Sequence, residues 1–211
     1  WITPYFSLNF FLKYLFLVSL FFYGWGEPRY VIIMSVAIVT GYVFGRLIEA
    51  FRGKGLSKVF LVISVLFAIC ILGYFKYTDF FIDNINRVTG LSIPLLKIAL
   101  PIGISFYTFQ ALGYTIDVYR GDIEPEKNFC IYALFVSFFP QLVAGPIERS
   151  KNLLVQFRTP PKFNPSKALD GIFLMLYGYF VKIVIADRAA IVVNAVFGNI
   201  AEYPGWYLII A

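Results

Sequence analysis

In a chain of 211 residues, 60% hydrophobic and only 14% charged residues leave more apolar surface than the interior of a soluble domain can hide. A mean hydropathy of +0.77 therefore predicts an all-α, multi-pass transmembrane helical protein, with the lipid bilayer as its solvent. The formal net charge of +6 does not indicate nucleic-acid binding, because the charges lie in short loops between apolar runs and form no basic face for a duplex.

Three apolar runs fill the N-terminal part of the chain. They lie at about residues 6–25, 30–48 and 59–75. Within the second run, Ala37, Gly41 and Gly45 recur every four residues, a small-residue face that lets helix backbones approach closely in lipid. The loop at 46–58 carries four basic residues and one acidic residue, so we expect it to be cytoplasmic.

The segments around the centre of the chain are more mixed. Residues 77–94 combine charges with aromatic residues and predict an interfacial loop or a short surface helix, followed by a helix at 95–116. Farther on, Asn164 stands as an N-cap before a proline and opens a helix at 165–185. The apolar segment 189–197 after it is too short to span a bilayer alone.

Polar side chains form one stripe on the central helix. At intervals of three, four and three residues, the stripe contains Tyr107, Gln110, Tyr114 and Asp117. Polar groups at membrane depth are costly, so they either satisfy each other at a helix–helix contact or line a polar cavity or substrate path. On the second interpretation a Gln110→Leu variant folds normally and loses activity, which is the outcome we expect from the sequence.

The apolar segment at 129–146 contains an unusual break. Pro140, Gln141, Gly145 and Pro146 interrupt it, and an interior proline removes a backbone donor and disrupts the helix. Broken helices at membrane depth are tolerated where protein or water surrounds them. We therefore expect broken or re-entrant helices here.

Charge counting gives a topology for this segment. The loop at 148–167 has five basic residues and one acidic residue, so it should be cytoplasmic like the loop at 46–58. A full crossing by 129–146 would put the two basic loops on opposite sides. A re-entrant hairpin that turns at Pro140 keeps both inside, and we favour this arrangement.

Few residues in the chain have the character of catalytic or metal-binding groups. The sequence has no histidine, and Cys70 and Cys130 have no metal-ligand spacing, so no metal site and no bound cofactor are expected. Asp117 adjoins the polar stripe, where pairing with Arg120 at the helix end is the simpler role. Arg149 could hold an anionic donor, although positive-inside topology alone also explains it.

Three motifs resemble the membrane-bound O-acyltransferase family. They are LPIGISFYTFQ at 100–110, DVYRG at 117–121 and FPQLVAGPI at 139–147. Together with FFYGW at 21–25 they resemble more narrowly the bacterial branch of alginate O-acetyltransferases and teichoic acid D-alanyltransferase components. The resemblance covers most of the chain.

The resemblance implies a multi-pass protein of the plasma (inner) membrane. It implies transfer of an acyl group, with acetyl preferred, from a cytoplasmic donor such as acetyl-CoA or an acyl carrier to a hydroxyl of an extracytoplasmic polysaccharide such as alginate, or to a partner acyltransferase. The alternative is a membrane transporter or channel, because broken helices with polar stripes also occur there.

The catalytic histidine of that family lies in a Trp-His pair that is absent from this sequence. We therefore expect residues 1–211 to be the N-terminal part of a single membrane domain, truncated at both ends, and to have no acyltransferase activity alone. The candidate residues for the substrate path are Tyr107, Gln110, Tyr114, Asp117, Gln141 and Arg149.

Overall fold

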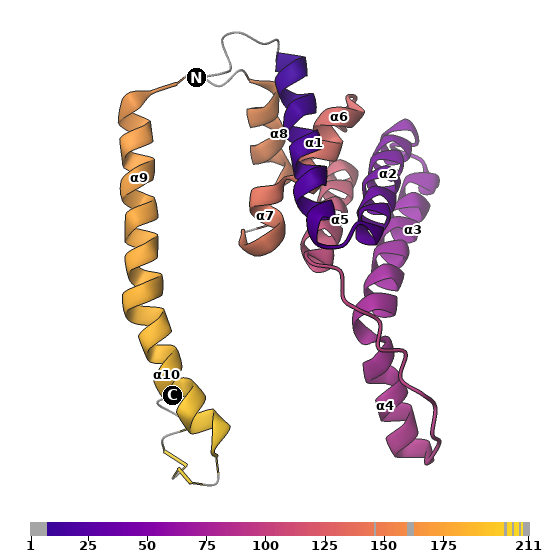
Figure 1. The fold of residues 1–211 in the computed structure, drawn as a ribbon. Coiled ribbons are helices and arrows are strands. Elements are labelled where there is room, and N and C mark those ends of the chain that lie inside the picture. Colours follow the sequence, from indigo (N-terminus) through magenta and orange to yellow (C-terminus); the bar gives the residue numbers. More distant parts are fainter. Residues whose placement is uncertain are drawn as a thin grey trace. The chain divides into compact units, whose positions relative to one another are not determined.

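The computed structural model describes residues 8–145, 147–159, 163–200, 202, 203, 205, 206 and 208. The chain divides into two compact units, Trp1–Pro161 and Lys162–Ala211. The helices of the first unit are α1 (Leu8–Gly26), α2 (Arg29–Ala50), α3 (Gly55–Leu72), the π-helical η2 (Gly73–Tyr77), α4 (Thr78–Thr89), α5 (Ile104–Arg120), α6 (Phe129–Ser137), α7 (Phe139–Ala144) and α8 (Ser150–Arg158). Those of the second are α9 (Pro165–Phe180), the π-helical η3 (Val181–Ala186) and α10 (Asp187–Gly198). The described residues contain no strand, which confirms the all-α prediction (Figure 1).

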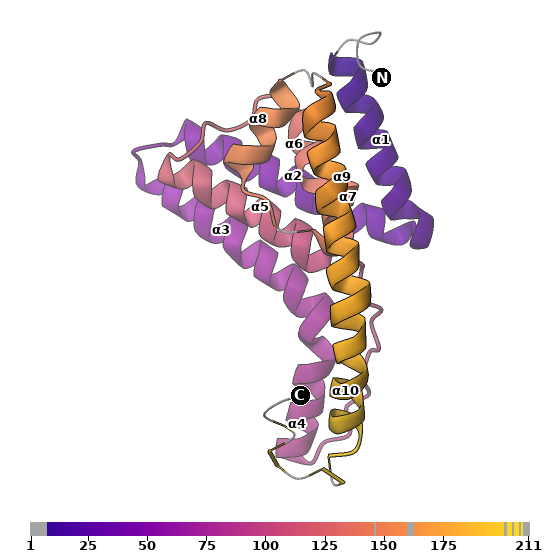
Figure 2. The same cartoon turned by 90° about the vertical axis from the view of Figure 1, so that its left-hand side faces the viewer.

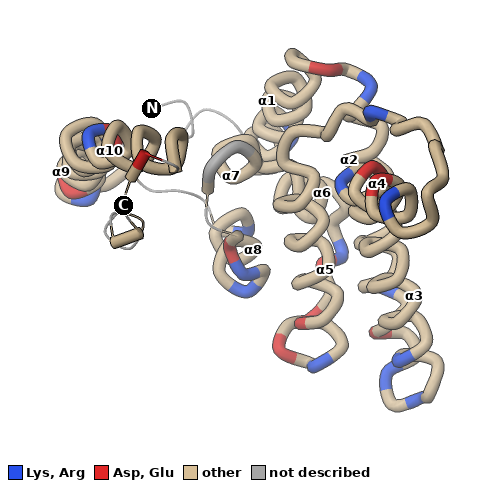
Figure 3. The backbone as a smooth tube through the Cα atoms, turned by 90° about the horizontal axis from the view of Figure 1, so that it is seen from below, with Lys and Arg blue, Asp and Glu red and all other residues tan. Residues whose placement is uncertain are grey.

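Among the described residues, two helical stretches are long and apolar enough to cross a bilayer. They are Arg29–Ala50 with 22 residues and Gly55–Thr89 with 35 residues. On α3, Leu66 and Ile69 are each 56% exposed, as expected of side chains that face lipid tails. Charged residues lie mainly at helix ends and in the connecting turns (Figure 3). These features confirm a membrane helical protein.

Small residues on α2 let it pack closely against its neighbours. A Cβ added at Gly41 would collide with the Tyr132 hydroxyl of α6, and one added at Gly45 would lie 2.6 Å from Cε1 of Tyr114 on α5. Ala37 is buried on the same face. The predicted packing role of these small residues is therefore confirmed, and it places α5 and α6 directly against α2 (Figure 1).

A long helix and a returning segment lie at the end of the first unit. Residues 78–89 form a short helix, which was one of the two predicted alternatives. This helix, α4, is not separate, because α3 continues through η2 directly into it. The irregular segment 90–103 then returns beside it (Figures 1 and 2). The Asp79 carboxylate accepts the backbone N–H groups of Leu96 at 2.8 Å and Lys97 at 3.0 Å, which fixes the segment to α4.

The predicted helix at 95–116 is wrong in its first part. The α5 helix begins at Ile104, because Pro94 and Pro101 interrupt a helical path and Gly103 has a left-handed φ of +72° at the N-cap. The polar stripe itself lies within α5, as predicted.

The break in the 129–146 segment does occur, but not at the expected residue. Phe138 has ψ of 106° and separates α6 from α7, two residues before Pro140. Pro140 lies in the first turn of α7, where its missing N–H would have had no helical partner anyway. The chain leaves α7 at Gly145 (φ −82°, ψ 160°), where a Cβ would lie 2.7 Å from Cα of Gln141. The expectation of a turn at Pro140 is therefore wrong.

The α6–α7 segment runs antiparallel to α5 and the chain then comes back. The backbone N–H of Glu126, before α6, donates to the Tyr114 hydroxyl at 2.8 Å. A Cβ at Gly103, at the other end of α5, would lie 2.7 Å from the carbonyl oxygen of Leu142 in α7. After α7 the chain returns along α5, and the Ser150 hydroxyl donates to Asp117. Both ends of the 126–150 segment thus meet the same end of α5.

The first basic loop lies at that end too. The Arg52 guanidinium donates from Nη2 to the carbonyl oxygen of Val118 at 2.9 Å. Because Val118 adjoins Asp117, the contact of Ser150 with Asp117 brings the start of the second basic loop to the same end. The segment therefore runs along α5 and returns to the same end, as the predicted re-entrant hairpin requires, while its place in the membrane and the cytoplasmic location of both loops stay predictions.

The second unit is a long helical stretch. The Asn164 side chain accepts the N–H groups of Ser166 at 3.0 Å and Lys167 at 3.3 Å, so the predicted N-cap is confirmed. The helix does not end at residue 185 as predicted, but continues through η3 and α10 to Gly198. No proline interrupts this stretch, and Lys182 pairs with Asp187 at 2.8 Å across the expected boundary.

Candidate functional site: a polar pocket beside α5

Three of the four stripe residues are buried in the contact between α5 and its neighbours. Tyr107 is 0% exposed, Gln110 is 3% exposed and Tyr114 is 1% exposed, whereas Asp117 at the helix end is partly exposed. The inner part of the stripe is therefore packed, and its outer end reaches a more open environment.

Gln110 holds the broken helix together. Its Nε2 donates to the carbonyl oxygen of Phe135 at 2.8 Å and to Oε1 of Gln141 at 2.9 Å. Because α6 ends at Ser137, the carbonyl groups of its last turn lack the usual helical donors. Gln110 supplies one of them. The two hydrogen bonds contradict the expectation that a Gln110→Leu variant folds normally.

Tyr114 and Asp117 tie α5 to the segments on either side of α6–α7. Tyr114 accepts from the backbone of Glu126, and Asp117 accepts from the hydroxyl of Ser150. The predicted pairing of Asp117 with Arg120 is wrong, since no ion pair joins them among the described residues. The serine donor replaces it.

A polar pocket of about 210 Å³ opens where these contacts meet. It is bounded by α5 and the turn after it on one side and by the returning segment on the other. Its lining residues are Phe109, Gln110, Gly113, Tyr114, Asp117, Arg120, Asp122, Ile147, Glu148, Arg149 and Ser150. The structure thus brings together four of the predicted path residues, namely Gln110, Tyr114, Asp117 and Arg149.

Two basic residues line the pocket, Arg120 on α5 and Arg149 on the returning segment, and the sequence predicts an anion-binding role for Arg149. Its side chain is exposed, and it forms no ion pair or hydrogen bond from the guanidinium with the described part of the chain. Its backbone carbonyl instead accepts from Asn152 and Leu153 at the start of α8. A fixed backbone with a free guanidinium is an arrangement that can bind an anionic group with two parallel hydrogen bonds.

Tyr107 and Gln141 do not line this pocket. Tyr107 packs edge-on against Tyr23 of α1, with ring centroids 6.1 Å apart, deeper along α5. Gln141 is buried and accepts from Gln110. The pocket includes neither residue, and their role in a substrate path stays a prediction.

Two residues that the sequence did not single out complete the site. Ser150 anchors the returning segment, and Glu126 is buried with 4% exposure. Glu126 lies in an acidic turn with Asp122 and Glu124, and nothing in the spacing separates it from them. Only the fold shows which carboxylate is enclosed.

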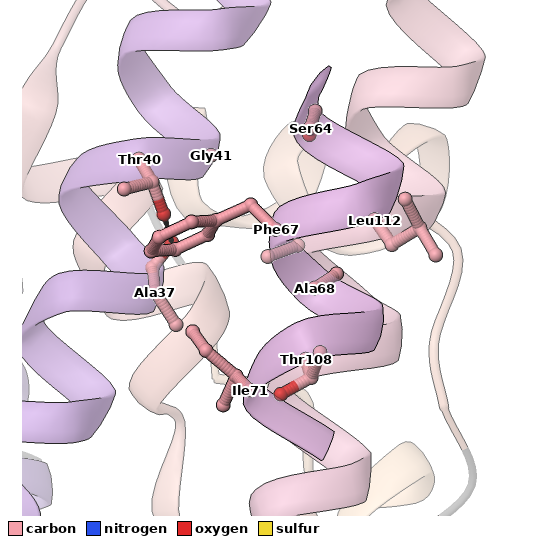
Figure 4. A pocket seen from close by; sticks show the side chains of 10 residues that line it. Ala37, Thr40, Gly41, Ser64, Phe67, Ala68, Ile71, Thr108 and Leu112 are labelled. Atoms are coloured by element: carbon pink, nitrogen blue, oxygen red, sulfur yellow. Dashed lines mark hydrogen bonds between the residues drawn. The ribbon is translucent and has the colours of Figure 1, made fainter. Parts of the chain in front are cut away.

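A second pocket, between α2, α3 and α5, is too small for a substrate. Its volume is about 20 Å³, enough for a single water molecule. Thr40, Ser64 and Thr108 contribute hydroxyl groups around it, and the Phe67 ring points from α3 toward α2 (Figure 4). In the described part of the chain no group of His, Cys, Asp and Glu residues is arranged to hold a metal ion.

Comparison with known proteins gives relatives along most of the chain. The chain is 37% identical over 182 residues to the "Probable alginate O-acetylase AlgI" of Pseudomonas aeruginosa, covering 83% of this chain and 35% of the relative. It is 32% identical over 203 residues to the "Peptidoglycan O-acetyltransferase" of Helicobacter pylori, covering 84% of this chain and 38% of the relative. It is 25% identical over 156 residues to the "Teichoic acid D-alanyltransferase" of Lacticaseibacillus rhamnosus, covering 73% of this chain and 35% of the relative.

The chain spans about a third of the length of these curated relatives. No protein-family model matches the chain. No solved structure matches it.

Proposed function

The chain belongs to the membrane-bound O-acyltransferase family, and from this premise we propose that the protein transfers an acyl group across the inner membrane to an extracytoplasmic polysaccharide. The preferred reaction moves an acetyl group from acetyl-CoA, or from an acyl carrier, to a polysaccharide hydroxyl such as those of alginate. The transporter alternative has less support, because the relatives are named as an O-acetylase and transferases.

In this proposal the pocket beside α5 receives the donor from the cytoplasm. Donor and acceptor lie on opposite sides of the bilayer, so the reaction needs a polar path that starts on the cytoplasmic side. The pocket meets the end of α5 at which both basic loops gather. Arg149 binds an anionic part of the donor, and Gln110 and Tyr114 form the inner wall.

One observation carries the proposal, namely the exposed guanidinium of Arg149 on the rim of a pocket of about 210 Å³ whose inner wall is formed by the hydrogen-bonded side chains of Gln110 and Tyr114. The sequence contains no histidine, so the general base that the family uses is not among these residues. These residues accordingly bind and orient the donor, and the chemical step is completed elsewhere in the protein.

Arg149→Gln in the full-length protein is expected to raise the KM for the acyl donor by about 10–100-fold, the usual worth of a hydrogen bond to a charged group. Arg149→Lys should restore part of the loss, because lysine keeps the charge but not the two parallel hydrogen bonds. Initial rates of polymer acylation in membrane vesicles, at varied donor concentration, provide the measurement.

Arg87→Gln is the matched control. Arg87 is exposed on α4, pairs with Asp83 and lies outside the pocket. An unchanged KM in both Arg149 variants would remove the pocket as the donor site.

A further inference from the structure

The wall of the pocket that carries Arg149 has few bonds of its own. Within the described residues 147–149, the hydrogen bonds to other parts of the chain are those that the Arg149 carbonyl accepts from α8. Beyond it, Ser150 donates to Asp117, and Phe157 packs against the Phe138 ring with centroids 5.4 Å apart. The position of the wall therefore depends on how α8 is held.

Glu126 holds the far end of α8. Its Oε2 accepts from both Nε and Nη2 of Arg158, at 3.0 and 2.7 Å, and its Oε1 accepts from the backbone N–H of Asn128 at 2.9 Å. The side chain of Glu126 is 5% exposed and that of Arg158 is 49% exposed. The two guanidinium donors converge on one carboxylate oxygen, and the backbone of Asn128 holds the other oxygen, so the contact limits both the distance and the rotation of the two side chains.

The same residue touches the opposite wall of the pocket. The backbone N–H of Glu126 donates to the hydroxyl of Tyr114, which lines the pocket from α5. A closed chain of contacts thus runs from Tyr114 through Glu126 to Arg158, and along α8 back to Arg149. Through these contacts, the Glu126–Arg158 ion pair influences the distance between α5 and the segment that carries Arg149.

We propose that Glu126 and Arg158 are a positioning pair that sets the width of the donor pocket by holding α8, and with it Arg149, against α5. The inference rests on the proposed function of the pocket and extends it to a pair that does not touch the donor. Neither Glu126 nor Arg158 lines the pocket.

The informative variant is Glu126→Gln. It removes the charge without changing the size of the side chain, and Arg158, being half exposed, remains solvated when its partner is neutral. In the full-length protein we expect the KM for the acyl donor to rise about tenfold with kcat changed less than twofold, because misplacement of a binding group weakens productive binding. Arg158→Gln should give the same effect, and Arg158→Lys should restore most of it.

The double variant Glu126→Gln/Arg158→Gln separates a pair from two independent residues. Because both changes remove one interaction, the KM of the double variant should equal that of either single variant, whereas independent residues would multiply their effects. Asp83→Asn, which breaks the exposed pair with Arg87 on α4, is the control and should leave the KM unchanged.

A distance measurement tests the pair without any catalysis. Spin labels at Tyr119→Cys on α5 and Lys151→Cys on α8, in a Cys70→Ala/Cys130→Ala background, report the spacing of the two walls. We expect one narrow distance distribution with the pair intact and a broader one with Glu126→Gln. If the parent protein shows no acyl transfer, the proposed function fails while this comparison still tests the pair. An unchanged distribution, or a reduced folded yield with an unchanged KM, would overturn the positioning role.

Discussion

Replacing Gln110 with leucine is expected to lower the free energy of unfolding by about 2–5 kcal/mol, because it leaves two buried acceptors without donors at about 1–3 kcal/mol each and removes the contact between α5 and α7. The acceptors are the carbonyl oxygen of Phe135 and the side-chain oxygen of Gln141.

Thermal unfolding of the purified protein in detergent, together with folded yield, provides the measurement for Gln110→Leu. Gln156→Leu is the matched control, since Gln156 is exposed on α8 and its side chain forms no hydrogen bond within the described residues. The control should unfold at nearly the parent temperature. Equal stability of Gln110→Leu and Gln156→Leu would contradict the role of Gln110 in holding the α6–α7 break.

Gly103→Ala is expected to be the most destabilising of the glycine substitutions in the first unit. Its φ of +72° costs an alanine about 1–2 kcal/mol, and the added Cβ would meet the backbone carbonyl of Leu142 at 2.7 Å. A backbone atom cannot move aside alone, so α7 must shift, at a further cost of about 1–3 kcal/mol.

Gly90→Ala carries the first of these costs, the backbone strain, without the second. Gly90 has nearly the same φ, +71°, but an added Cβ there has no atom within 4 Å. The difference in free energy of unfolding between Gly103→Ala and Gly90→Ala therefore measures the α5–α7 contact alone. A difference near zero would show that α7 does not rest on the start of α5.

The sequence correctly predicted those features of the fold that depend on contacts between neighbouring residues. Asn164 before a proline predicted an N-cap, and the spacing of Ala37, Gly41 and Gly45 predicted a close packing face. Both depend on the chemistry of a few neighbouring residues, which the sequence displays directly.

Features that depend on distant contacts were placed less well. The break between α6 and α7 falls at Phe138 instead of Pro140, since the carbonyl of Phe135 is satisfied by Gln110 from another helix. The segment 90–103 was expected to be partly helical, but Asp79 holds its backbone in another path. No local rule specifies partners that lie so far away in the chain.

In the candidate site, too, the features that depend on local spacing were predicted and those that depend on distant contacts were not. The stripe from Tyr107 to Asp117 followed from helical periodicity, and the structure places Gln110, Tyr114 and Asp117 beside Arg149. Gln110 itself could have been a cavity wall or a helix contact, and only its two hydrogen bonds decide that it also holds the break.

The central claim is that the segment between Glu126 and Ser150 enters and leaves the membrane on one side. Single cysteines at Lys54 and Lys151 in the Cys70→Ala/Cys130→Ala background, labelled with a membrane-impermeant thiol reagent, test it directly. Thr89→Cys, at the far end of the long Gly55–Thr89 helix, reports the opposite side. In intact spheroplasts we expect labelling at position 89 only, and labelling at 54 and 151 after the membrane is opened. Labelling of position 151 together with position 89 in intact spheroplasts would mean that 129–146 crosses the membrane completely, and would contradict the re-entrant fold.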